Sequence, residues 1–140
     1  MLQDQYRIMI VDDEPDIAEG IADTMSVLTG HTCHPYSNAL HALAVFKTRP
    51  YHLVLTDLTM PGLGGFDLLA KMRKLHPVTD FIVITAHKSK EVVYNSHFLG
   101  ATNIFYKPLN IEELETAVIQ CYQKFILWQQ RFQEVSFINQ

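Results

Sequence analysis

Five polar residues follow directly on short apolar runs, and their types could support phosphoryl chemistry. They are Asp12 and Asp13 after "IMIV", Asp57 after "LVLT", Thr85 at the end of "FIVIT", and Lys107 after "NIFY". Carboxylates held close together repel one another unless a hard cation lies among them, and an oxygen-rich set without histidine suits Mg²⁺ better than Zn²⁺. A lysine and a hydroxyl suit the oxygens of a phosphoryl group. The chemistry that fits is the formation of an aspartyl phosphate.

The elements that must position these residues alternate along the chain. Short runs of β type alternate with longer segments of helical period, which is typical of an α/β domain with a parallel sheet. The predicted strands are Arg7–Val11, His31–Tyr36, Leu53–Thr56, Phe81–Thr85 and Ile104–Tyr106. In open parallel sheets, ligands bind outside the carboxyl ends of the strands, near the point where strand order reverses. We therefore predict that the five polar side chains converge on one site.

Local signals also predict the helices and the place of one strand. Nearly continuous apolar runs indicate central strands, whereas Pro35 in "HTCHPYS" removes a ladder donor and indicates an edge strand. The helices are predicted from Pro15 to Gly30, from Ser37 or Asn38 to before Pro50, from Phe66 to Leu75, from Ser89 to Leu99, and from near Asn110.

Composition indicates one globular domain and argues against several classes of protein. The chain has 140 residues, 48% of them hydrophobic, which is enough to bury a core. A net charge of -4 with 11 scattered Lys and Arg residues gives no nucleic-acid surface, so we expect no direct nucleic acid binding. No apolar run approaches the roughly 18 residues of a membrane span, and the N-terminus lacks a signal peptide. We therefore expect a cytoplasmic protein without membrane insertion.

Four segments resemble, in order, the motifs of the receiver domain of bacterial two-component response regulators. They are "IMIVDDEPDI", "LVLTDLTMPGLGGFDLL", "FIVITAH" and "GATNIFYKPLN", and the resemblance covers about residues 6–123. It implies a doubly wound, flavodoxin-like five-stranded parallel sheet with strand order 2-1-3-4-5. Residue by residue, it implies a phosphoacceptor, Asp57; a Mg²⁺ site of Asp12, Asp13, Asp57 and the backbone carbonyl of Thr59; and two phosphoryl contacts, Thr85 and Lys107. The implied partners are a sensor histidine kinase or phosphotransfer protein and an effector that the sequence does not identify.

Simpler interpretations exist for each residue alone, and two other functional classes stay open. An Asp after a strand usually caps a helix or forms a turn. A haloacid-dehalogenase-type phosphatase uses the same residue types, but its D-x-D-x-T/V motif is absent from the acceptor segment "DLTMP". A degenerate receiver that only binds protein is the other class, and the complete set of five polar residues argues against it. We expect a signalling switch and not an enzyme.

Three positions depart from the family pattern. Many receivers carry Tyr or Phe three residues before the lysine, where this chain has Ile104. A β-branched aliphatic side chain has no polar ring tip to move, so we expect the switch to depend more on Thr85 and the loop "AHKSKE". Phe105 could substitute only if the strand register differed by one residue. Thr59 and His87, at the positions that tune dephosphorylation, orient water poorly, which predicts slow loss of the phosphoryl group.

The C-terminal segment is longer than a receiver domain needs. A last helix of about four turns would end near Gln123 or Lys124, which predicts a receiver domain over residues 1–124 and a helical extension over residues 125–140. Apolar residues nevertheless continue at spacings of three and four: Ile111, Leu114, Val118, Cys121, Phe125, Trp128, Phe132 and Val135. This pattern predicts a projecting helix that forms a homodimer or continues toward an output domain. The alternative is a break near Lys124, with the tail folded over its own domain.

Overall fold

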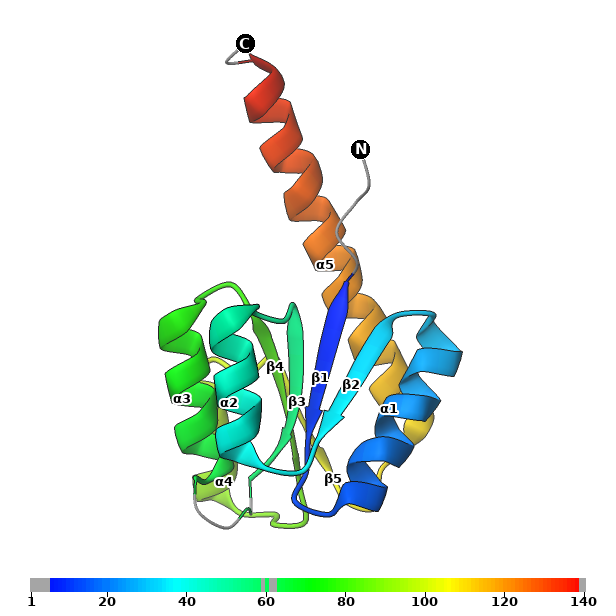
Figure 1. Ribbon diagram of the computed structural model, residues 1–140, viewed down its shortest axis with the longest axis vertical. Helices are drawn as coiled ribbons and strands as arrows, with labels where there is room; N and C mark the ends of the chain where they lie inside the picture. Colours follow the sequence, from blue (N-terminus) through cyan, green and yellow to red (C-terminus); the bar gives the residue numbers. More distant parts are fainter. Residues whose placement is uncertain (1–5, 59, 61–62, 139–140) are drawn as a thin grey trace.

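A parallel sheet of five strands lies at the centre of the protein, in a computed structural model that describes residues 6–58, 60 and 63–138 (Figure 1). The strands are β1 (Arg7–Val11), β2 (Thr32–Tyr36), β3 (Leu53–Asp57), β4 (Asp80–Thr85) and β5 (Asn103–Tyr106). Their order is β2-β1-β3-β4-β5, which confirms the predicted doubly wound, flavodoxin-like sheet. Strands β1, β3 and β4 are buried along their whole length, and β2 with Pro35 lies at an edge, as the sequence predicts.

In the part of the chain that the structure describes, five helices alternate with these strands. They are α1 (Pro15–Thr29), α2 (Ala39–Thr48), α3 (Gly65–Leu75), α4 (Lys90–Phe98) and α5 (Ile111–Ile138). Pro15 occupies the first position of α1, and Gly30 ends that helix with a φ of 75°. The side chains of Asn38 and Ser89 accept backbone N–H groups at the starts of α2 and α4. The predicted start and stop signals therefore act where the sequence places them.

The helices cover both faces of the sheet because side chains alternate along each strand (Figure 1). Ile8 and Ile10 of β1 pack with α1 and α5 on one face. Met9 and Val11 point to the other face and pack with α2 and α3. Each fully buried aliphatic side chain of this kind stabilises the fold by roughly 1.5–3 kcal/mol. The two hydrophobic layers hold the strands in register and so determine where their carboxyl ends lie.

Helix α5 is much longer than the sheet that it covers. It runs for 28 residues without a break, a length of about 42 Å at 1.5 Å per residue. Its first half lies against the sheet and its second half projects beyond it (Figure 1). The predicted long C-terminal helix is confirmed, and the alternative with a break near Lys124 is wrong. Among the helices that the structure describes, none is both long and apolar enough to cross a membrane.

Candidate functional site

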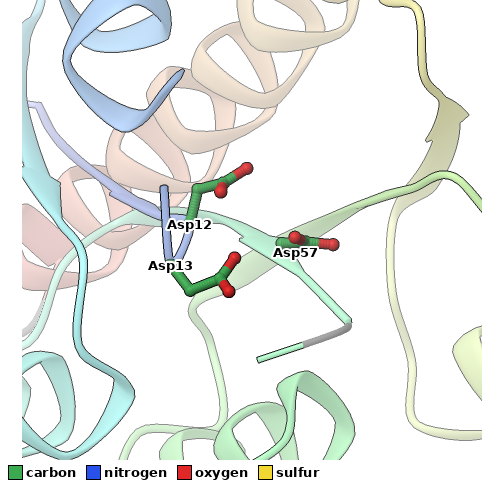
Figure 2. Close-up of side chains that lie close together, drawn as sticks. All are labelled: Asp12, Asp13 and Asp57. Carbon is green, nitrogen blue, oxygen red and sulfur yellow. The ribbon is translucent and has the colours of Figure 1, made fainter. Parts of the chain in front are cut away.

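Three carboxylates meet at the carboxyl end of the sheet. Figure 2 shows Asp12 and Asp13, which follow β1, beside Asp57, the last residue of β3. One oxygen of each lies within 4.8 Å of the others, and Asp12 and Asp57 are only 2% and 7% exposed. The two strands are neighbours, with Val11 paired to Thr56, so the residues that follow them must lie together. These closely spaced hard oxygen ligands suit a divalent cation such as Mg²⁺.

Lys107 reaches this cluster from the end of β5. Its Nζ donates hydrogen bonds to Asp12 Oδ2 at 2.9 Å and to Asp57 Oδ2 at 3.4 Å. Burial acts to lower the pKa of Lys107, but the hydrogen bonds and charges of Asp12 and Asp57 outweigh it and raise that pKa above its ordinary value. Among the residues that the structure describes, one ammonium group, that of Lys107, is hydrogen bonded within a cluster of three carboxyl groups, and a divalent cation would balance the remaining acidic groups.

Thr85, the last residue of β4, is fully buried beside Lys107. The backbone N–H of Lys107 donates to the carbonyl oxygen of Thr85 at 2.9 Å, which holds the two residues side by side on adjacent strands. The Thr85 hydroxyl accepts a hydrogen bond from the backbone N–H of His87 at 3.0 Å. A hydroxyl that accepts one bond still has a hydrogen to donate. Thr85 therefore links the acidic site to the first residues of the loop before α4.

One predicted ligand and one residue that sequence reasoning missed follow β3 along the chain. Thr59, whose backbone carbonyl the resemblance makes a metal ligand, lies outside the described residues. Gly65, the first residue of α3, lies directly against the acceptor strand, since a Cβ there would be 2.2 Å from the carbonyl oxygen of Asp57. A Gly-Gly pair at a predicted helix start was the signal available for such a close approach.

The register of β5 determines which side of the sheet Ile104, Phe105 and Tyr106 face. Val83 pairs with Ile104 and Ile84 with Phe105, so Ile104 packs on the α2–α3 side while Phe105 packs on the α5 side. Phe105 therefore does not share the side of Ile104, and the shifted register that its substitution for the family's aromatic residue would require is not present. Tyr106 shares the side of Ile104, as the two-residue period of a strand could have predicted. The Nζ of Lys88 lies 5.1 Å from its ring centroid, within cation–π distance.

Tyr106 also forms part of a surface groove between β5 and α4. The groove has a volume of about 550 Å³ and is lined by Lys88, Ser89, Lys90, Val93, Tyr94, His97 and Tyr106. Three of these residues belong to the segment that connects Thr85 to the first turn of α4. The loop that begins at the acidic site thus lines part of this groove.

The fold and the acidic edge together define a flavodoxin-like α/β protein with a candidate site for a divalent cation and a phosphoryl group. The profile of the response regulator receiver domain family matches residues 8–119, and the chain belongs to this family. The predicted family is therefore confirmed over most of the chain.

Several proteins from other organisms are similar to this chain. It is 34% identical over 113 residues to sporulation initiation phosphotransferase F of Bacillus subtilis, an alignment that covers 80% of this chain and 90% of that protein. It is 27% identical over 120 residues to a probable chemotaxis protein CheY of Rhizobium etli, covering 84% and 92%. Identity to the DNA-binding transcriptional regulator NtrC of Salmonella typhimurium is 28% over 106 residues, or 76% of this chain, but the chain spans only 22% of that regulator.

Solved structures agree with this assignment. A CheY-like response regulator receiver domain protein from Methanospirillum hungatei superposes with a TM-score of 0.79 at 26% identity, covering 91% of this chain and 99% of that one. A response regulator receiver domain protein from Clostridium thermocellum superposes with a TM-score of 0.80 at 25% identity, covering 87% and 98%. Both describe nearly whole receiver domains, so the shared fold includes the strand ends that form the site.

Proposed function

We propose that this chain is a phosphorylation-dependent switch of a two-component system, in which Asp57 accepts a phosphoryl group from a sensor histidine kinase or a phosphotransfer protein. The observation that carries this proposal is the meeting of Asp12, Asp13 and Asp57 with Lys107 at one edge of the sheet, in a member of the receiver family. The likeness to a relative named as a phosphotransferase, across 90% of that relative, adds support.

The proposed reaction transfers the phosphoryl group to one carboxylate oxygen of Asp57. That oxygen attacks phosphorus, an O–P bond forms, the bond from phosphorus to the donor nitrogen or oxygen breaks, and the leaving group takes the electron pair. Lys107 contributes a positive charge to the phosphoryl oxygens, and Thr85 donates a hydrogen bond to one of them. Asp12, Asp13, Asp57 and the carbonyl of Thr59 would hold Mg²⁺, which supplies neutralisation of the negative charge that gathers there.

We propose that Thr85 and the loop to α4 pass the modification to the surface. Movement of the Thr85 hydroxyl toward a phosphoryl oxygen pulls on the backbone of His87, to which it is hydrogen bonded at 3.0 Å. Only residues 86–89 separate Thr85 from α4, and Ser89 caps that helix. A displacement at Thr85 therefore reaches Lys88 and the Tyr106 ring within one short loop. This route does not need an aromatic residue at position 104.

We propose that the chain accepts a phosphoryl group without steady turnover and acts in the cytoplasm beside its donor. Thr59 and His87, two residues after Asp57 and Thr85 respectively, are poor groups for orienting an attacking water. We also propose that residues 1–124 form the receiver unit and residues 125–140 its extension. Phe125 still packs against the core, whereas Trp128 is 57% exposed, which supports a boundary near Lys124.

Intact-mass analysis tests the acceptor directly. With Mg²⁺ and acetyl phosphate as a small donor, the chain should gain the mass of one phosphoryl group, and the gain should disappear in Asp57→Asn and in EDTA. Asp16→Asn, which changes an exposed carboxylate in the first turn of α1, is the matched control and should keep the gain. An adduct that persists in Asp57→Asn, or no adduct at all, would refute the proposal. Steady phosphate release from a phosphomonoester would favour the phosphatase alternative.

A further inference from the structure

The projecting half of α5 exposes a row of large apolar side chains, here called the extension stripe: Trp128, Phe132 and Val135. Their exposed fractions are 57%, 71% and 55%. In the first half of the same helix, Leu114 and Val118 are completely buried. The apolar face of this helix is thus buried against the domain in its first half and exposed in its second half. An exposed apolar surface of this kind is typical of a protein-binding site.

The extension stripe lies on the side of α5 that packs against the sheet further down. Trp128 comes seven residues after Cys121, and Phe132 comes seven after Phe125 and fourteen after Val118. Seven residues are almost two helical turns, with a drift of only about 20°. Cys121 and Val118 face the core, and Phe125 makes ring contacts with Tyr6 and His52 at its rim. The apolar face of α5 therefore continues in line past the edge of the sheet.

We infer that the extension stripe pairs with the same stripe of a second copy of this chain, with the two α5 helices antiparallel. A heptad spacing of apolar residues is the pattern that packs against a like pattern. The side chains of residues 125–140 carry two charges, Arg131 and Glu134, and these pair with each other at 2.9 Å. The extension therefore has no excess charge of one sign that would oppose its own copy.

The exposed area comes close to what such a pair needs. A whole aromatic side chain buries about 150–250 Å², so the exposed fractions of Trp128 and Phe132 amount to roughly 250 Å² in each copy. Val135 and the neighbouring Leu127, which is 45% exposed, add to this area in both copies. The total approaches the roughly 1,000 Å² that a specific interface buries.

The position of the sheet determines the orientation. Paired helices lie about 8–10 Å apart. Between Leu114 and Cys121, the apolar side of each α5 is already covered by the sheet of the same copy. In a parallel pair, the first half of the partner's α5 would have to occupy the space that this sheet fills. In an antiparallel pair only the two extensions overlap, and the two sheets lie at opposite ends. The continuity of the apolar face thus excludes the parallel arrangement for a straight helix.

Antiparallel pairing also gives consistent layers. When the two-fold axis passes near Gln130, Trp128 meets Phe132 of the partner subunit, and Phe125 meets Val135 of the partner subunit. Each layer then joins a larger to a smaller side chain, as interdigitating helices require. The tip of each extension reaches the aromatic cluster around Phe125 at the rim of the other sheet.

Light scattering after size exclusion tests the pairing. The full chain should elute with twice its mass of 16.1 kDa at high micromolar concentration, and Trp128→Glu/Phe132→Glu should elute as a monomer. The matched control is Val27→Glu, at a site in α1 that is 84% exposed, which should stay a dimer. All three proteins should still accept a phosphoryl group on Asp57, which separates this test from that of the proposed function. A monomeric full chain, or a dimer that survives the double substitution, would overturn the inference.

A spin label tests the orientation. Thr116 is exposed on α5 and lies 14 residues before Gln130, so labels at Thr116→Cys in an antiparallel pair are 28 residues apart along the helices. At 1.5 Å per residue this predicts a separation of about 42 Å. The labelled protein carries Cys33→Ala, because Cys33 is partly exposed, while Cys121 is buried. A separation below about 20 Å, as side-by-side helices would give, refutes the antiparallel pairing.

Discussion

The acidic edge of the sheet and the projecting half of α5 differ in how many secondary-structure elements position their side chains. At the acidic edge, carboxylate oxygens of residues that follow β1 and end β3 lie within 4.8 Å of one another, and Lys107 after β5 donates hydrogen bonds to two of these carboxylates. Asp12, Asp57 and Thr85 are almost completely buried. In the projecting half of α5, one helix alone places Trp128 and Phe132, and both side chains are largely exposed.

Near-complete burial at the acidic edge and incomplete burial in the extension have different consequences. Burial in the domain places charged groups where their repulsion must be balanced by a cation, which creates a site with defined chemistry. Burial is incomplete in the extension, so its apolar surface has affinity for another surface but no chemistry of its own. Helix α5 belongs to both regions with a single apolar period, which makes it a direct test of the comparison.

The largest effect should come from shortening a side chain in the covered half of α5. Leu114→Ala leaves a cavity in a layer where Leu114 is 0% exposed, so we expect the free energy of unfolding to fall by about 3 kcal/mol. Phe132→Ala, in the uncovered half of the same helix, should change it by less than about 0.5 kcal/mol in dilute, monomeric protein. Urea unfolding followed by circular dichroism measures both. Equal losses would show that the two halves of α5 are not differently packed.

A second prediction concerns the close approach behind the acceptor. Gly65→Ala places a Cβ 2.2 Å from the carbonyl oxygen of Asp57, so α3 or β3 must shift, at a cost of about 2 kcal/mol. Gly20→Ala is the matched control, because no atom lies within 4 Å of its new Cβ on the exposed side of α1. That change should stabilise the protein by up to about 1 kcal/mol. Thermal unfolding of the two variants should therefore shift in opposite directions.

A third prediction concerns the metal at the acidic edge. Asp13→Asn removes one of three clustered carboxylates, so the affinity for Mg²⁺ should fall about tenfold, or about 1.4 kcal/mol. Asp67→Asn, in the first turn of α3 and outside the cluster, should leave the affinity unchanged. Isothermal titration calorimetry with Mg²⁺ alone measures both variants. Unchanged binding in Asp13→Asn would remove this residue from the proposed ligands.

The smallest effect is expected at the junction of the two regions, where the ring of His31 lies 4.4 Å from that of Tyr122 in α5. Burial lowers the pKa of His31 below its ordinary value of about 6.5, so below that pH the unfolded chain binds a proton more readily than the folded one. The contribution of His31 to stability is complete above this pH and is lost as the pH falls through the lower, folded-state pKa.

Chemical unfolding at pH 7 and pH 5 measures this contribution. His31→Phe keeps an aromatic ring beside Tyr122 but cannot bind a proton, so its stability should decrease less between the two pH values than that of the unsubstituted chain. An identical decrease in stability in both proteins would show that protonation of His31 does not affect the packing at this junction.

Local signals were enough to predict the secondary structure and the edge position of β2, whereas the full order of the strands was implied by the family resemblance. Pro15 and Gly30 delimit α1, Asn38 and Ser89 cap α2 and α4, and Pro35 places β2 at an edge. These signals act through a residue's own backbone preferences or through neighbours a few positions away. They remain readable in the sequence because no distant contact is needed to produce them.

The candidate site was predictable as a set of residues but not as a set of contacts. Strand ends in a parallel sheet must share an edge, so the meeting of Asp12, Asp13 and Asp57 follows from the order of the elements. The sequence could not show that Lys107 donates hydrogen bonds to both Asp12 and Asp57. These bonds depend on the direction of the Lys107 side chain, and the two partners lie 95 and 50 residues before it in the chain.

Three features therefore depended on tertiary packing. Gly65 lies against the backbone of Asp57 only because α3 packs closely behind β3. The ring of Tyr106 lies near Lys88 only because the register of β5 turns that ring toward the loop before α4. The apolar period of α5 is continuous in the sequence, yet Leu114 is buried and Phe132 is exposed. A repeat of apolar residues specifies which face of a helix is apolar, whereas the extent of the sheet determines how much of that face is buried.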